Sequence, residues 1–548
     1  MHQFRVALIA AAALLACHGQ AIALTFQTDS ISGNFDSTVS VGTGVRARHA
    51  TCGLVLAGAT GEGAPAGCLA PTSALGDQGN LNYDRGDRFT TYLKGSHELL
   101  LKLPSEVSVL ARANWVRDFS STQTSGFSSA VDPGAPAVTD GLSADARKDL
   151  RFKARLLDLW VSKSFEVGEQ RARVRVGNQV ISWGESLFLP GGINSTNAVD
   201  IMRLSQPGTQ LKEAVLPAPM ISVASGLGPG LNFEAYLQTR WNANYFPPTG
   251  SYWSVVNGLG RGDSAYGLAT VKARNSGQWG ASLRYQPDGT QLNLGLYAMN
   301  YHDKGPNFST NIHDTGAVGW TYAEDRKLYG ASANFPLGDW AIGTELSYRP
   351  KDAVALNANA SGCSSQNGNC WVDEKRLQWH VTALYSATPG NARGLLELLG
   401  ADTATLLAEA VLIRYPKLKA SYGGDPIAAG GWGWGQETDA AGTPVPVGTK
   451  TSAGFNFDFS WVYDGTLVKG WQVVPEIYYF QALSGRTPNV VGNFMKGAKS
   501  ANFIVSLIQN PASWQVAVNY AVFRGGKSVF DQPYRDRDFF GINVSRNF

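Results

Sequence analysis

The sequence predicts an all-β fold, a transmembrane antiparallel β-barrel of about 16–18 strands with long extracellular loops and a plug segment in the lumen. Three observations predict it. Many segments alternate apolar and polar residues at a period of two, short and long connections alternate between them, and the chain begins like an export signal. A soluble β-sandwich also shows the first of these features, so the alternation alone does not decide the class.

The N-terminus predicts export from the cytoplasm. Residues 1–23 contain the basic Arg5, an apolar run and the small-x-small triplet Ala21-Ile22-Ala23, which indicate a signal peptide cleaved after Ala23. A lipoprotein site is the alternative, because "LLAC" ends at Cys17. In either case residues 24–548 form one predicted barrel domain in the outer membrane of a Gram-negative bacterium.

Four further cysteines form two close pairs in Gly/Ser/Asn/Ala-rich stretches, Cys52 with Cys68 and Cys363 with Cys370. An exported protein passes through an oxidising compartment, so we expect two loop-closing disulfides. A metal site is the alternative, but no His or further Cys stands at ligand spacing beside either pair. We therefore expect no metal.

The composition excludes several classes of protein. Mean hydropathy is −0.14, which is too polar for a bundle of membrane helices. The long uncharged run at 214–231 is broken by prolines and glycines, so it is not a spanning helix. The formal net charge of +3 is small for 548 residues and argues against nucleic acid as a partner.

The stretch "AGFNFDFSWVY" shows the strand pattern most strongly. Phe455, Phe457 and Phe459 share one face of a strand, and Asn456 and Asp458 share the other. In a membrane barrel the apolar face contacts lipid and the polar face lines the lumen. Outer-membrane lipid and lipopolysaccharide are therefore expected neighbours.

Connection lengths favour the barrel over the sandwich. Every second connection is short, as in "EVGEQR", "GLGPG" and "PLGDW". Short periplasmic turns and long external loops are typical of outer-membrane barrels, and here they predict about eighteen strands with both termini periplasmic. One turn, 387–402, is long and is expected to hold a short helix. Aromatic residues lie beside the short turns, as a periplasmic girdle requires: Phe165, Tyr285, Phe335, Trp340, Tyr463, Trp471, Trp514 and Phe548.

The last strand carries a predicted assembly signal. Phe540, Ile542 and Val544 alternate before the terminal Phe548, as in strands that the barrel-assembly machinery recognises. Arg546 departs from the usual pattern, which has a hydrophobic residue there.

Residues 176–220 differ from the other long connections, because they combine apolar and aromatic groups with Gly191-Gly192. A surface loop this apolar would be poorly solvated, so we expect a plug or constriction inside the barrel, with a well-packed external loop as the alternative. Trp183 and Phe188 would supply apolar contact area, and Glu185 and Arg203 would anchor the segment to charges in the lumen.

The stretches "NLNYDRGDRFT", "VGNQVISWGESLFLPGGINSTNAVDIMRL", "LKEAVLPAPM" and "NYFPPTGSYWS", with the C-terminal end, resemble the proteobacterial outer-membrane family called domain of unknown function 1302. The resemblance runs from about Thr25 to Phe548 and is most specific at 176–220. It implies an outer-membrane location, often beside lipid- or hydrophobe-handling export partners. It brings no established catalytic residues and no settled solute.

We find no catalytic motif and expect neither an enzyme nor a cofactor. The primary hypothesis is a channel for a small hydrophobic or aromatic solute, gated by 176–220. Alternatives are a general porin for polar solutes, and an outer-membrane partner or scaffold of a lipid-export system. The porin hypothesis draws on polar residues of lumen parity: Asp36, Arg46, Arg48, Arg112, Asn114, Asn456 and Asp458.

Overall fold

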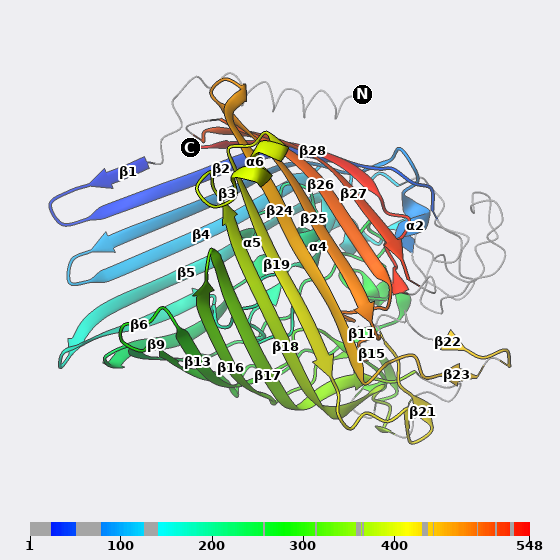
Figure 1. Ribbon diagram of the computed structural model, residues 1–548. Coiled ribbons are helices and arrows are strands. Elements are labelled where there is room, and N and C mark those ends of the chain that lie inside the picture. Colours follow the sequence, from blue (N-terminus) through cyan, green and yellow to red (C-terminus); the bar gives the residue numbers. More distant parts are fainter. Residues whose placement is uncertain are drawn as a thin grey trace.

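The chain forms one closed barrel of antiparallel strands (Figure 1). The computed structural model describes residues 24–548 except 51–77, 125–140, 256–257, 313–314, 358–362, 364–365, 430–436, 442, 490–491, 510–511 and 527–530. The predicted signal peptide and the predicted Cys52–Cys68 disulfide therefore lie outside the described residues.

Eighteen of the nineteen strands in the main sheet form the ring, which confirms the predicted fold class. The first and last barrel strands close it, from the pair Thr38–Asn547 to the pair Arg46–Phe539. The ring runs through β2 (Ser32–Arg46), β3 (Arg88–Leu103), β4 (Val107–Asp118), β5 (Phe152–Val167), β6 (Gln170–Gln179), β9 (Ala218–Gly228), β10 (Leu231–Gln238), β12 (Gln278–Tyr285), β13 (Asn293–Tyr301), β16 (Arg326–Leu337), β17 (Trp340–Ala355), β18 (Trp371–Ala387), β19 (Thr403–Arg414), β24 (Thr451–Val468), β25 (Trp471–Ser484), β26 (Ala498–Gln509), β27 (Trp514–Gly525) and β28 (Phe539–Asn547).

Short and long connections alternate as the sequence predicts. The tightest turns have two residues, one of them a glycine with positive φ, as at Gly168 and Gly230. The long turn 387–402 holds the expected helix, α6 (Arg393–Leu399), which packs on the outward-facing Tyr385 and Trp461. The C-terminus lies at the same rim as α6 (Figure 1).

The remaining elements are short and belong mainly to the long connections. Cys363 and Cys370 form a disulfide within the connection from β17 to β18, with their Cα atoms 5.2 Å apart. Among the described residues, no helix is both long enough and apolar enough to cross a membrane. The short elements are β1 (Leu24–Gln27), α2 (Gln78–Asn82), α3 (Ala144–Arg151), β7 (Ala198–Val199), α4 (Ile201–Ser205), α5 (Leu211–Ala214), β8 (Val215–Leu216), the 3-10 helix η3 (Asp263–Tyr266), β11 (Ala269–Thr270), β14 (Asn307–Ile312), β15 (Ala317–Thr321), β20 (Ser421–Tyr422), β21 (Asp425–Pro426), β22 (Glu437–Thr438) and β23 (Pro444–Val445).

The two faces of the wall differ in chemistry. On β17, Leu346 is 48% exposed on the outer face, whereas its neighbour Glu345 is 1% exposed on the inner face. On β28, Phe540 and Ile542 are exposed on the outer face. An apolar outer surface suits lipid. The burial of Glu345 requires something inside the barrel to cover it.

Candidate functional site

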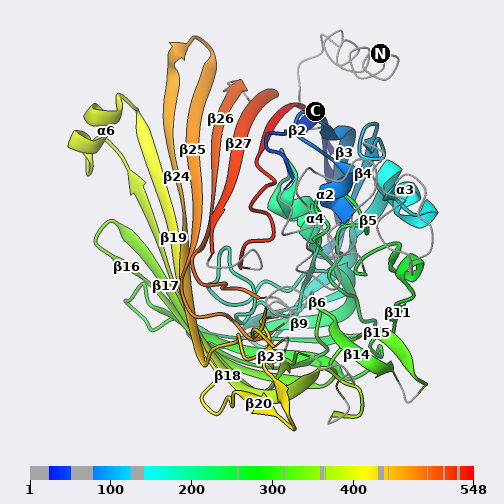
Figure 2. The same ribbon diagram turned by 90° about the vertical axis from the view of Figure 1, so that its right-hand side faces the viewer.

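The connection between β6 and β9, residues 180–217, folds to the inside of the barrel, where its helix α4 lies within the ring of strands (Figure 2). We divide it into a first arm, residues 181–195, and a second arm, residues 198–216. The first arm contacts β10 to β19 and reaches β25, and the second arm contacts β3, β5 and β28. The segment therefore touches walls on both sides of the ring.

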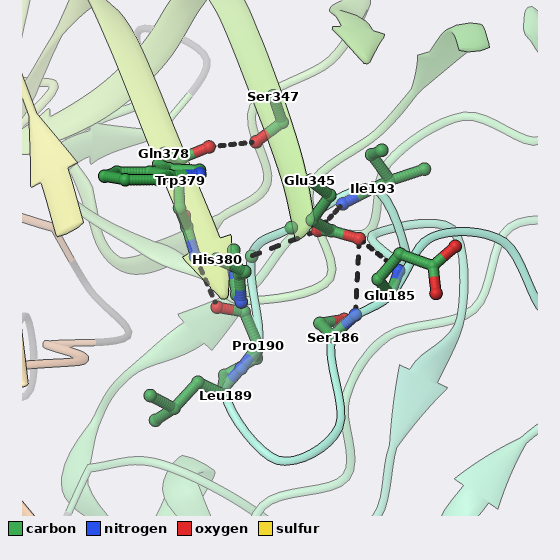
Figure 3. A network of polar contacts seen from close by, with 12 residues as sticks. Glu185, Ser186, Leu189, Pro190, Ile193, Glu345, Ser347, Gln378, Trp379 and His380 are labelled. Atoms are coloured by element: carbon green, nitrogen blue, oxygen red, sulfur yellow. Dashed lines mark hydrogen bonds and ion pairs between the residues drawn. The ribbon is translucent and has the colours of Figure 1, made fainter. Parts of the chain in front are cut away.

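The carboxylate of Glu345, on β17, holds the backbone of the first arm. It accepts hydrogen bonds from the backbone N–H groups of Glu185 at 2.6 Å, Ser186 at 3.3 Å and Ile193 at 2.8 Å (Figure 3). A buried carboxylate is tolerated when such donors replace its water. The contact uses backbone atoms, so it fixes the path of the chain.

A second buried carboxylate repeats the arrangement. Glu409, on β19, accepts from the backbone N–H groups of Phe188 at 2.7 Å and Leu189 at 2.9 Å. Its other oxygen lies 2.6 Å from Nδ1 of His380, on β18. The neighbouring Gln378 donates to the carbonyl of Pro190 at 3.1 Å. Three adjacent strands thus hold one short stretch of the arm.

The positively charged Arg349 holds the carbonyl groups of the Gly191-Gly192 turn, as the carboxylates hold the N–H groups. Its guanidinium donates to the carbonyls of Gly191 at 2.6 Å and Gly192 at 3.0 Å, and to Oγ of Ser195 at 2.7 Å. Gly191 has φ +93°, in the left-handed region that favours glycine. A Cβ on Gly192 would overlap the Glu345 carboxylate. These two contacts explain why glycines stand here.

Apolar packing completes the attachment of the first arm. Trp183 is 3% exposed, lies beside Tyr236 and Tyr297, and donates from Nε1 to Glu234 at 2.7 Å. Phe188 is half-buried, and its ring lies 5.6 Å from that of Tyr478 on β25. Trp183 therefore holds the segment on the wall, and Phe188 reaches toward the far side.

The second arm is held by two ion pairs and by hydrogen bonds to its backbone, among them one from the Tyr92 hydroxyl of β3 to the carbonyl of Pro207 at 2.9 Å. Asp200 caps α4 by accepting from the backbone N–H of Arg203 at 2.8 Å, and its carboxylate pairs with Arg155 of β5. Lys94 of β3 pairs with Glu213 at 2.8 Å and donates to the carbonyl of Gly208 at 2.6 Å.

The four residues predicted to form the constriction all lie in the segment. The two charged ones, Glu185 and Arg203, were expected to pair with charges of the lumen wall, and they make other contacts. Glu185 accepts from the Asn334 amide at 3.1 Å, and burial raises the pKa of its carboxyl. Arg203 is buried and its guanidinium reaches Gln206 at 3.4 Å, within its own segment. Among the described residues neither forms an ion pair with the wall.

The anchoring charges are instead on the wall, in Glu345, Arg349 and Glu409, with His380 beside them. Sequence reasoning missed them as anchors. The available signal was a charged residue at lumen parity inside an otherwise uncharged stretch, as in "AIGTELSY".

Three leucines of the segment are exposed although the segment lies inside the ring. Leu187 is 42% exposed, Leu204 50% and Leu211 63%. Their side chains face space on the lumen side of the wall, where lipid is absent.

A family model described as "Protein of unknown function (DUF1302)" matches residues 4–548. The chain belongs to this family. Its model covers the barrel strands and both arms of the segment. Among functionally curated proteins, no sequence matches the chain.

Several solved outer-membrane channels are similar in fold at low identity. OpdK of Pseudomonas aeruginosa, solved with vanillate, is 12% identical, with 95% of this chain and 98% of that chain covered and a TM-score of 0.40. OccAB1 of Acinetobacter baumannii is 11% identical, with 96% and 99% covered and a TM-score of 0.43. OprD of P. aeruginosa is 12% identical, with 96% and 97% covered and a TM-score of 0.41. Likeness at this level transfers neither a solute nor a residue role.

The closed antiparallel ring, its apolar outer face and its short turns at one rim make this an outer-membrane β-barrel of a Gram-negative bacterium. Within the described part of the chain, no group of three or more His, Cys, Asp or Glu side chains is placed to hold a metal ion.

Proposed function

We propose that the protein is an outer-membrane channel for a small hydrophobic or aromatic solute, and that the 176–220 segment constricts the passage. The observation that carries this proposal is the exposure of Leu187, Leu204 and Leu211 on a segment bonded to the inner wall. Exposed leucines gain by covering an apolar solute, because both surfaces leave water.

The size of the ring supports a constricting role for the segment. A ring of eighteen strands encloses a lumen comparable with that of porins, which leaks unless something fills it. The segment touches walls on both sides of that lumen, so it divides the cross-section. Solutes would pass between the segment and the remaining wall.

A general porin for polar solutes is the second candidate. Its support is a set of lumen-parity charges on opposite walls, with Arg173 and Arg175 on β6 and Asp458 and Glu476 on β24 and β25. Such opposed charges favour small polar solutes in a water-filled passage. The two candidate functions differ in the role of the three leucines: they bind the solute in a hydrophobic channel, and they do not bind it in a general porin.

The leucines provide the test. We would measure interruptions of ionic current through the purified protein in planar bilayers, with benzyl alcohol and glucose as probes. The channel should be blocked by benzyl alcohol at lower concentration than by glucose. Changing all three leucines to asparagine should raise the blocking concentration of benzyl alcohol by about tenfold to a hundredfold, since each covered leucine is worth up to roughly 1 kcal/mol at partial burial.

A matched control is Leu398→Asn, which alters an exposed leucine of α6 on the outside of the ring. It should leave the block unchanged. Equal block by both probes, unaltered in the triple variant, would favour the porin and reject the hydrophobic channel.

A further inference from the structure

We propose that Arg173 and Arg175 of β6 form a carboxylate-binding site in the lumen, and that the solute is a small hydrophobic or aromatic carboxylic acid. This inference rests on the proposed channel function and adds the charged group that the solute carries. It depends on where the two guanidinium groups face, on their lack of partners, and on the charges across the barrel.

The two arginines share the inner face of β6. Val176, of the opposite parity, is exposed on the outer face. Gln179 has the parity of the arginines, is fully buried, and accepts from Oγ of Ser222 at 2.9 Å on the neighbouring strand. Residues two apart on one face of a strand are about 6.6 Å apart, so two guanidinium groups form a short basic row.

Other inner arginines near the segment already have partners. Arg112 pairs with Asp158, Arg155 pairs with Asp200, and Arg349 binds the segment backbone. Within the described ranges, Arg173 and Arg175 have neither an ion pair nor a hydrogen bond from their guanidinium groups, and Nε of Arg175 is buried without a partner. In the described part of the chain, Asp158 and Glu234 act on Arg175 electrostatically without a hydrogen bond or ion pair to it, so the outer guanidinium nitrogens of both arginines keep donors for a ligand.

The Arg175 guanidinium is also held in position. It lies over the ring of Trp160 on β5, 4.1 Å from the ring centre. Arg173, two residues nearer the turn, is exposed. A fixed guanidinium plane beside an aromatic ring suits an arene or alkyl chain that ends in a carboxylate, because guanidinium binds carboxylate through two parallel hydrogen bonds.

The opposite wall carries the opposite charge. Asp458 and Glu476 lie at lumen parity on β24 and β25, which are about half-way round the ring from β6. Among the described residues neither carboxylate has an ion pair. Opposed rows of charge create a transverse field that directs an anionic head toward β6. A neutral hydrophobic solute would gain nothing from it.

Three probes of similar size separate the possibilities: benzoate, benzyl alcohol and benzylamine. In planar bilayers at neutral pH, benzoate should block the current at roughly threefold to tenfold lower concentration than benzyl alcohol, as one partly exposed charge-assisted contact provides. Arg173→Gln with Arg175→Gln should remove this preference and leave the block by benzyl alcohol unchanged. It should also shift the reversal potential in a potassium chloride gradient toward cation selectivity.

Arg171→Gln is the matched control. Arg171 has the same parity, but it lies at the turn and pairs with Glu106, so its loss should leave the benzoate preference intact. Heat-modifiability on gels would establish that each variant is folded. If none of the three probes blocks the current, the proposed function fails. If benzyl alcohol blocks but benzoate blocks no better, or keeps its advantage in the double variant, the channel stands and the carboxylate site is rejected.

Discussion

The two arms of the inner segment are attached in different ways. The first arm is held through its backbone, by Glu345, Glu409 and Arg349 on strands β17 and β19, with little of the contact exposed to water. The second arm contributes its own charged side chains, in the Lys94–Glu213 and Arg155–Asp200 pairs, and its backbone also accepts hydrogen bonds from Lys94 and Tyr92 of β3. Two of the three exposed leucines of the segment, Leu204 and Leu211, are on the second arm.

The difference assigns separate roles to the arms. Backbone groups bonded to buried charges have no substitute partner, so releasing the first arm leaves several polar groups unsatisfied at once. A buried ion pair, by contrast, contributes little net stability over apolar residues. We therefore expect the first arm to be the fixed anchor and the second arm to tune the passage.

The largest effect should follow Glu345→Gln. The new amide places an N–H donor where one carboxylate oxygen accepted backbone N–H groups of the first arm. We expect a loss of about 2–3 kcal/mol in the local opening free energy of residues 185–193, since unsatisfied buried donors cost about 1–3 kcal/mol each. Amide hydrogen exchange read by mass spectrometry measures it. Glu397→Gln, an exposed carboxylate on α6, is the control, and equal protection in both variants would refute the anchor.

The barrel strands could be predicted from sequence, whereas the attachment of the inner segment could not. Period-two alternation and connection lengths depend on neighbours along the chain, so they predicted the strands, and the apolar and aromatic content of one long connection singled out 176–220. The contact of Glu345 with Ile193 joins residues 152 positions apart across a lumen, and no local pattern encodes that distance. Trp183 was recognised as apolar, but its burial on β10 and β13 depends on which strand it meets.

A smaller effect should follow Gly192→Ala. The added Cβ would overlap the Glu345 carboxylate, which is itself held by the arm, so the turn must shift. We expect about 1–3 kcal/mol of lost local stability, the usual cost of overpacking. The same exchange measurement should show the loss at residues 185–193 and unchanged protection in the barrel strands. Gly394→Ala on α6, where a Cβ meets no neighbour, is the control.

The smallest effect should follow the paired change Lys94→Met with Glu213→Leu. Removing both charges avoids an unpaired buried group, so exchange at residues 200–214 should change by no more than about 1 kcal/mol. A loss as large as that of Glu345→Gln would erase the distinction between the arms. Lys94→Met alone leaves the buried Glu213 carboxylate without its ion-pair partner, so it should lower the local stability more than the double change does.

The most direct test removes the whole segment. Gln179 and Ala218 are partners in the β6–β9 ladder, so an Asn-Gly turn can replace residues 180–217 without disturbing the ring. Single-channel conductance in planar bilayers should then rise severalfold, and benzyl alcohol should no longer interrupt the current. Unchanged conductance in a deletion variant that remains folded and heat-modifiable would contradict the claim that this segment constricts the passage.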